Sequence, residues 1–385
     1  MSARRRCLLF AVIAMLVIFA ACTSGDLASD LENRAEELRV QYDLPGLQVA
    51  CALPDGEVVR VAVGLADSTS GAAMTTEHFL PAGSVGKTGL AAVVLSLVND
   101  GTLDLDAPVS RWLGDEDWFA RLPNAGPEMT LRVLMNHASG LPDHLDTEGF
   151  LTHCRDMVRP GGTPDDPLPP REALSFILDH EPLFAVGERF RYTDTAYLVA
   201  GLTAEKASGR VYYELLQERF LTPLGFDGIV PQDRRDLPGL ANGYLQSENP
   251  FGMPPSTLLP DGRLNHNPML EWTGGGLVTR TGDLARFIRL LYGGEIMGWD
   301  YLADLTQGSA LPPDWKGPGT YGLAVFVQDS SHGEVRWHSG YYPGYNTMAS
   351  YWPDHDIAMA VQVNRDHETH LDEICAELER LVLKD

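Results

Sequence analysis

The chain places β-rich segments at its two ends and a helix-rich segment between them. Near the amino terminus, residues 47–53 and 58–63 are strand-like and flank the turn Pro54-Asp55-Gly56. Later strand-like runs lie at 321–328, 334–338, 346–352 and 357–363. Helical spacing of apolar residues marks 26–42 and 368–383. This order predicts an α+β fold in which both chain ends build one antiparallel sheet, flanked by helices, with a mostly helical insertion.

We expect one folded domain over residues 22–385, preceded by a signal peptide at 1–21. The sheet region would take about 26–83 and 285–385, and the helical region about 84–284. A helix is predicted from Ser84 to the stop signal Asn99-Asp100-Gly101. Three segments dense in proline, glycine and aspartate are predicted loops: 159–171, 248–268 and 308–319.

Composition excludes several classes of protein. Acidic residues outnumber basic ones by 53 to 29, and the net charge of −24 argues against a nucleic-acid partner. A hydrophobic fraction of 44% supports a large core and excludes a disordered chain. Cys51, Cys154 and Cys375 lie far apart in the sequence and lack metal-type spacing. We expect each to be a buried thiol; a disulfide between two of them remains an alternative.

The first 22 residues have the pattern of an export signal. Arg4, Arg5 and Arg6 precede an apolar run that ends in Ala20-Ala21-Cys22. We expect Cys22 to be acylated as the first residue of a lipoprotein; an ordinary cleaved signal and an uncleaved anchor remain alternatives. Each alternative places the domain outside the cytoplasm, in the periplasm or another extracytoplasmic space, and the first attaches it to the membrane by lipid.

Ser84 and Lys87 carry the first sign of chemistry. Three residues apart at a helix start, their hydroxyl and amine lie on one face about one turn apart. A serine needs an adjacent base to become a nucleophile, and a desolvated lysine can serve. The alternative is a helix cap followed by a solvated lysine.

Two further clusters point to a known family. They are Arg191-Tyr192-Thr193-Asp194 and Trp337-His338-Ser339-Gly340-Tyr341. Together with Ser84 and Lys87 they resemble the signatures of the penicillin-recognising serine hydrolases: serine with lysine one turn on, Tyr-x-Asn, and Lys/His-x-Gly. The resemblance is closest to class C β-lactamases, serine DD-peptidases and family VIII esterases. Residues 131–143, 223–225 and 273–277 are similar to family landmarks in the expected order.

The resemblance implies a β-lactamase/transpeptidase-like fold and a role for each matching residue. Ser84 would be the nucleophile, Lys87 its proton acceptor or electrostatic activator, and Tyr192 the general base or acid. Backbone N–H groups of Ser84 and Tyr341 would form the oxyanion hole. Substrate would contact four positions: Asp194, His338, Ser339 and Gly340. No metal or organic cofactor is implied.

Two departures from the family pattern bear on the substrate. Asp194 replaces the usual asparagine, and an ionised aspartate only accepts hydrogen bonds. It should hold Lys87 as an ammonium and shift proton abstraction toward Tyr192. His338 replaces lysine and is a weaker anchor for a carboxylate. Both changes disfavour a dedicated β-lactamase, and we expect Asp194→Asn to raise penicillin acylation.

The sequence therefore predicts a serine hydrolase that forms an acyl-enzyme from a small ester, amide or short peptide. A DD-peptidase, a D-amino-acid peptidase, a β-lactamase and a catalytically silent envelope-binding member remain alternatives. An α/β-hydrolase turn at 82–86 is disfavoured because residues 75–78 before it are polar. His137 is predicted to be structural, and 366–370 to be the acidic start of the last helix rather than a metal site.

Overall fold

The computed structural model describes residues 27–237 and 239–383. Cys22 and the signal segment 1–21 lie outside these residues, so export and lipid attachment stay predictions. No helix in the described part of the chain has both the length and the hydrophobicity that a membrane crossing requires.

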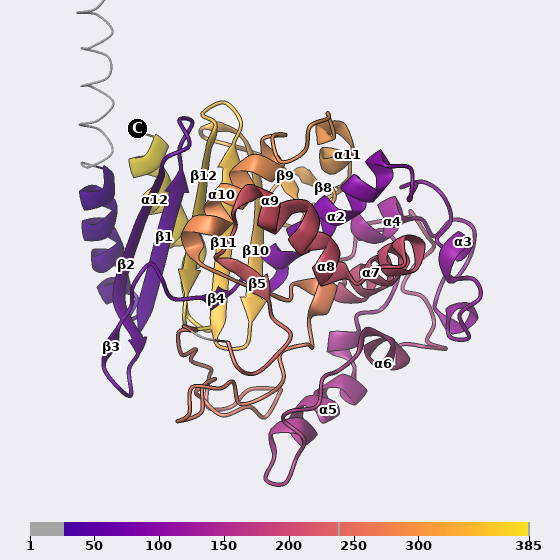
Figure 1. Ribbon diagram of the computed structural model, residues 1–385, viewed down its shortest axis with the longest axis horizontal. Helices are drawn as coiled ribbons and strands as arrows, with labels where there is room; N and C mark the ends of the chain where they lie inside the picture. The colour runs from indigo at the N-terminus through magenta and orange to yellow at the C-terminus, as the bar shows by residue number, and fades with distance from the viewer. Residues whose placement is uncertain (1–26, 238, 384–385) are drawn as a thin grey trace, which may run out of the picture.

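A nine-stranded antiparallel sheet occupies one side of the molecule (Figure 1), in the order β3-β2-β1-β12-β11-β10-β9-β8-β7. Its strands are β1 (Gly46–Ala52), β2 (Val58–Asp67), β3 (Ala72–Ala73), β7 (Ser309–Ala310), β8 (Gly319–Tyr321), β9 (Phe326–Ser330), β10 (Gly333–Tyr342), β11 (Tyr345–Trp352) and β12 (Ile357–Val363). Because β1 pairs with β12, the two ends of the chain meet within one sheet. The predicted fold class is confirmed.

The prediction of one continuous strand over 321–328 is wrong, because a turn interrupts it. β8 ends at Tyr321 and β9 begins at Phe326, and between them the N–H of Gly322 donates to Val325 O at 2.8 Å. Ala324 has a φ of 58°, which a strand does not accommodate. Leu323 to Val325 are fully buried, so this apolar run signalled burial in a turn and not a continuous strand.

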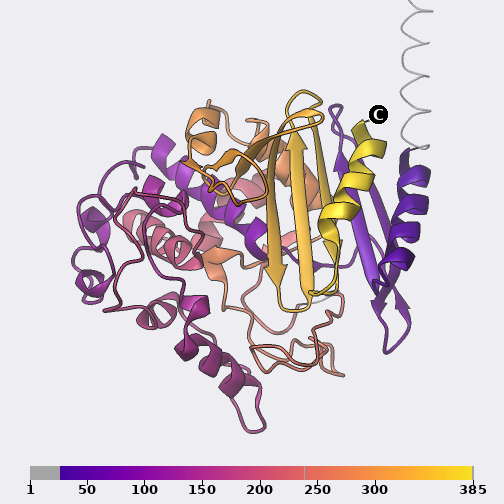
Figure 2. The same cartoon turned by 180° about the vertical axis from the view of Figure 1, so that it is seen from behind.

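The two faces of the sheet carry different helices. On one face lie a helix over residues 27–41 and α12 (Leu371–Leu383), as Figure 2 shows. Val49 and Val361 point to this side and pack with Leu31 and Leu378. On the other face, alanines such as Ala50 and Ala360 belong to the main core. Small side chains there let α10 (Thr281–Tyr292) pack closely on the sheet.

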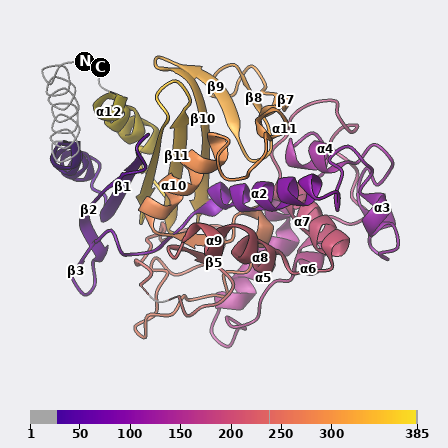
Figure 3. The same cartoon turned by 45° about the horizontal axis from the view of Figure 1, so that its top comes forward.

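The remaining helices form the second half of the molecule: α2 (Lys87–Asn99), α3 (Ser110–Leu113), α4 (Leu131–Met135), α5 (Glu148–Val158), α6 (Pro170–Ser175), α7 (Asp194–Ser208), α8 (Tyr212–Leu216), α9 (Thr222–Leu224) and α11 (Leu302–Thr306). A small second sheet is made of β4 (Leu80–Pro81), β6 (Leu277–Thr279) and β5 (Ile229–Pro231). In Figure 3, α2 runs through the middle of the molecule. Residues 90–95 of α2 are fully buried, so other parts of the protein surround this helix on all its faces.

Two smaller expectations are also settled. The last helix begins at Leu371 and not at Glu368, because Glu368 and His370 have left-handed φ values of 46° and 49°. The segment 366–370 therefore precedes the helix. Cys51, Cys154 and Cys375 are free and buried, so no disulfide joins them.

Candidate active site

Ser84 and Lys87 lie together as the sequence predicted. A single 3₁₀ turn, Gly83–Gly86, holds Ser84 directly before α2, and Lys87 begins that helix. The Lys87 Nζ lies 2.9 Å from the Ser84 Oγ. The lysine is 0% exposed, so the alternative of a solvated lysine is excluded.

Three acceptors surround the Lys87 amine. It donates to Ser84 Oγ, to Asp194 Oδ1 and to the carbonyl oxygen of Gly274. Asp194 forms an ion pair with it, as the sequence analysis expected from their proximity. An ammonium has three N–H donors, and here each one has an acceptor. As the ammonium paired with Asp194, Lys87 donates one hydrogen bond to each of these acceptors, Ser84 Oγ included.

Asp194 is supported by a second carboxyl group. It is the first residue of α7, and its N–H donates to Asp143 Oδ2 at 3.0 Å. Burial, and then the negative charge of Asp194, raise the pKa of Asp143 to about 7. Sequence reasoning had treated Asp143 only as the end of a family landmark, and it lies directly behind the ion pair.

Tyr192 lies beside this group, with the Ser84 hydroxyl near its own. Its oxygen is buried and has no hydrogen-bond partner within the described ranges, and the Lys87 Nζ lies 5.0 Å from its ring centroid. Burial, followed by the charge of Asp194, raises the pKa of Tyr192 well above its usual range, while the Ser84 hydroxyl opposes this. This direction favours the protonated phenol over a tyrosinate in the resting site.

His137 positions the Tyr192 segment, which confirms its predicted structural role. Its ring centroid lies 4.0 Å from that of Tyr192. Its Nδ1 accepts from the N–H of Thr193 at 3.2 Å, and its carbonyl oxygen accepts from Arg191 at 2.8 Å. Burial lowers the pKa of His137, so a neutral imidazole packs against the tyrosine.

The edge of β10 brings a second backbone N–H to Ser84. Pairing between β9 and β10 stops at Trp337, so residues 338–342 lack a strand partner on that side. The hairpin closes at Tyr342 and Tyr345, and alternation along a strand then turns the N–H of Tyr341 toward the open edge. A methyl group on Gly83 would lie 2.7 Å from the Tyr341 nitrogen, which shows how close the two main chains are.

Gly340 is the residue that permits this contact. A Cβ at Gly340 would lie 2.0 Å from Ala82 O and 3.0 Å from Ser84 N. We expect Gly340→Ala to displace β10 from Ser84 and to lower kcat by about 100-fold, the cost of one misplaced oxyanion donor. Gly298→Ala is the matched control, because a Cβ at Gly298 meets nothing within 4 Å. Equal kcat values in the two variants would contradict the role of Gly340 in letting the edge of β10 approach Ser84.

The structure buries His338, and its predicted contact with substrate stays untested. Its side chain is 1% exposed; its Nε2 lies 2.8 Å from the Tyr321 hydroxyl and its Nδ1 lies 2.6 Å from Ser339 O. Burial lowers its pKa to about 3, so the ring is neutral. The alternation of β10 turns this residue into the core, where aromatic rings cover it. Ser339 and Gly340 border a different hollow, beside Asn346 and His370, so their predicted contact with substrate stays untested.

Ser84 opens into a cavity of about 410 Å³. Much of its wall is apolar. Leu145, Phe150 and Leu151 come from α5 and the turn before it, Pro250, Phe251 and Met253 come from the 248–268 loop, and Leu270 follows that loop. Tyr341 and Tyr342 close one side, and Asp146, Asp194 and Glu271 supply acidic groups. The loop that sequence composition marked as irregular thus shapes the space next to the nucleophile position.

Glu271 is the site residue that sequence reasoning missed. It lies two residues before the landmark 273–277, and that position was the only signal available. Burial, and then the charge of Asp194, raise the pKa of Glu271 to about 8, while the charge of Lys87 opposes this.

Among the described residues, no group of three or more His, Cys, Asp or Glu is arranged to hold a metal ion.

Comparison with known proteins agrees with this geometry. The family profile described as Beta-lactamase matches residues 31–384. Penicillin-binding protein 4* of Bacillus subtilis is 26% identical over 370 residues, which are 92% of this chain and 75% of that protein. D-aminopeptidase of Brucella anthropi is 33% identical over 199 residues, 51% of this chain and 35% of that protein.

Solved structures share the fold. A D-stereospecific amidohydrolase from Streptomyces sp. superposes with a TM-score of 0.75 at 24% identity, covering 90% of this chain and 98% of that one. With the profile match over nearly the whole described chain, the assignment is plain: this protein belongs to the Beta-lactamase family, and it is a serine hydrolase of that family.

Proposed function

We propose that Ser84 attacks the carbonyl carbon of a small ester or amide and forms an acyl-enzyme that water then hydrolyses. The observation that carries this proposal is the Lys87-to-Ser84 hydrogen bond of 2.9 Å at the wall of an open cavity. The N–H groups of Ser84 and Tyr341 would receive the developing oxyanion, since both main chains meet there.

Tyr192 would relay the proton. Lys87 already donates all three of its N–H groups, whereas the Tyr192 hydroxyl has no partner within the described ranges. As Ser84 Oγ bonds to the carbonyl carbon, its proton passes to the Tyr192 oxygen while the Tyr192 proton passes to the leaving group. The raised pKa of Tyr192 supports this concerted exchange, because it disfavours a tyrosinate formed beforehand. The Lys87 ammonium would stabilise the negative charge that develops on Ser84 Oγ as its proton leaves.

The acyl group would be small and apolar. The cavity beside Ser84 has an apolar wall and a volume suited to one side chain and its carbonyl group. The names of the similar proteins, a D-aminopeptidase and a D-stereospecific amidohydrolase, support amides as one substrate class. The export pattern supports action outside the cytoplasm, from a lipid anchor at Cys22.

Labelling by a serine-reactive fluorophosphonate tests the proposal. The wild type should be labelled and Ser84→Ala should not. Turnover of a nitrophenyl butyrate, a chromogenic cephalosporin and a D-aminoacyl anilide, each compared with Ser84→Ala, then ranks the acyl groups. A folded wild type that is neither labelled nor active would favour the silent, envelope-binding alternative.

A further inference from the structure

Glu271 presents a carboxyl group without a partner to the cavity. Its Oε2 is buried and has no hydrogen-bond partner among the residues that the structure describes, and no ion pair includes this side chain there. It lines the same cavity as Ser84 and Asp194. A Cβ on Gly275 would lie 2.8 Å from this oxygen, so the carboxyl group packs against the loop that follows it.

Asp194 and Glu271 differ in what remains free for a ligand. Asp194 forms an ion pair with Lys87, and its N–H is held by Asp143. Asp194 already has the Lys87 ammonium as its counter-charge, which leaves it less able to bind a second cation. Glu271 forms no ion pair among the described residues, and it lines the cavity together with Ser84.

A buried carboxyl group without a partner is costly. Its ionised form loses hydration and gains nothing in return, and the group responds by holding its proton. The pKa of about 8 expresses this cost, with burial as the main cause and Asp194 as the second. A cation that entered the cavity would remove the cost, because it would supply both the charge and the hydrogen-bond donors that the site lacks.

We propose that Glu271 binds the ammonium group of an aminoacyl substrate whose side chain occupies the apolar part of the cavity. The inference rests on the proposed function, because it names the substrate class for the same nucleophile. Apolar residues Phe150, Phe251 and Leu270 would take the substrate side chain, while Glu271 would fix the amine and so orient the carbonyl group toward Ser84. Glu271 is thus a specificity residue for free amines.

The test compares a free amine with a blocked one. For each protein, kcat/KM is measured for phenylalanine p-nitroanilide and for its N-acetyl derivative, with both enantiomers. We expect the wild type to prefer the free amine by about 10-fold or more, the value of one charge-assisted hydrogen bond. Glu271→Gln, which keeps the shape of the side chain, should reduce this ratio to near one.

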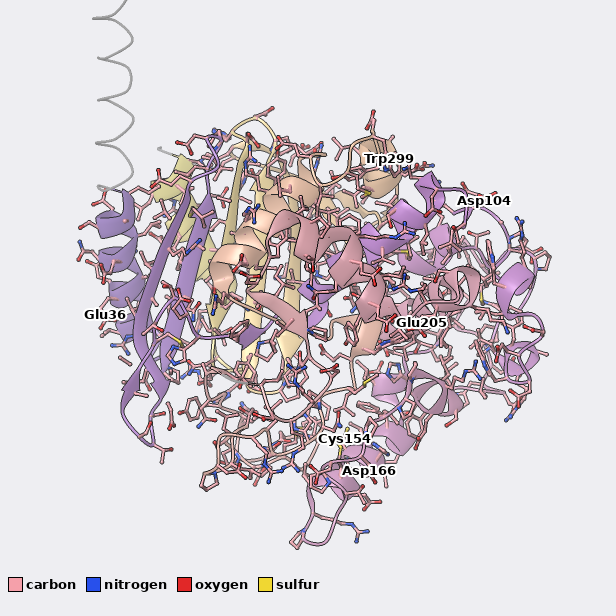
Figure 4. All side chains as sticks on the ribbon, in the orientation of Figure 1. Glu36, Asp104, Cys154, Asp166, Glu205 and Trp299 are labelled. Atoms are coloured by element: carbon pink, nitrogen blue, oxygen red, sulfur yellow. The ribbon has the colours of Figure 1, made fainter. Side chains whose placement is uncertain are left out.

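Asp166→Asn controls for the change in net charge. Asp166 is exposed in the 159–171 loop, near α5 at the bottom of Figure 4. It does not line the cavity, so its substitution should leave the free-amine ratio as in the wild type. An equal fall of the ratio in Asp166→Asn and Glu271→Gln would overturn a specific contact and favour long-range attraction.

A second measurement needs no variant. Competitive inhibition of nitrophenyl butyrate turnover by 2-phenylethylamine should be at least about 10-fold tighter than inhibition by 2-phenylethanol, which has the same ring without the charge. Equal inhibition constants, or a wild type without preference for the free amine, would overturn the role of Glu271 while ester turnover still stood. Absence of ester turnover and of Ser84 labelling would instead reject the proposed function.

Discussion

Tyr192→Phe is expected to lower kcat by about 1,000-fold, within the range for loss of a proton-transferring side chain. The same change should leave the free energy of unfolding unchanged or raise it slightly. The reason is that the Tyr192 oxygen is buried without a hydrogen-bond partner in the described structure, so its removal abolishes an uncompensated polar group. Loss of activity without loss of stability would distinguish proton relay from a packing role.

Tyr197→Phe is the matched control for this experiment. Both tyrosine rings lie close to the Lys87 Nζ, with centroids at 5.0 Å for Tyr192 and 5.3 Å for Tyr197. The Tyr197 hydroxyl, however, donates to Met135 O at 3.0 Å, so the control should lose about 1 kcal/mol of stability. Steady-state kinetics and urea unfolding measure both effects. A Tyr192→Phe variant that keeps its kcat within a few-fold of the wild type would reject the relay.

Asp194→Asn is expected to reduce the free energy of unfolding by about 3 kcal/mol, the lower end of the cost of breaking a buried ion pair. Lys87 is 0% exposed, so its ammonium would remain in the core without a counter-charge. The value lies at the lower end because Asp194 is 16% exposed and the Asp143 carboxyl lies behind it. Guanidinium unfolding of the purified variant measures this loss.

Removing both charges separates the ion pair from packing. The double variant Lys87→Met/Asp194→Asn should regain most of the stability, because a neutral pair of similar volume avoids an uncompensated charge. If the loss in free energy of unfolding of the double variant equals the sum of the losses of the two single variants, the two side chains act independently. The predicted gain in penicillin acylation for Asp194→Asn applies to the folded fraction, so stability must be measured first.

Local patterns were sufficient to predict much of the fold. The hairpin about Pro54-Asp55-Gly56, the end of α2 at Asn99 and the order of the late strands all depend on neighbours within a few residues. For the same reason the pairing of Ser84 with Lys87 could be predicted, since three residues along a helix start bring two side chains to one face. The one strand that failed, 321–328, had an apolar run that a buried turn also produces.

The sequence by itself determined that this protein has an α+β fold with a serine and a lysine side by side, because those features follow from short-range periodicity. The family resemblance, and not periodicity, placed Asp194 near Lys87. Only the tertiary structure decided the rest of their surroundings: Gly274 reaches Lys87 from a position 187 residues away, and Glu271 stays unpaired in the same cavity. Periodicity reports which side chains are buried but not which partners they find, and for a buried charge the partner determines the chemistry.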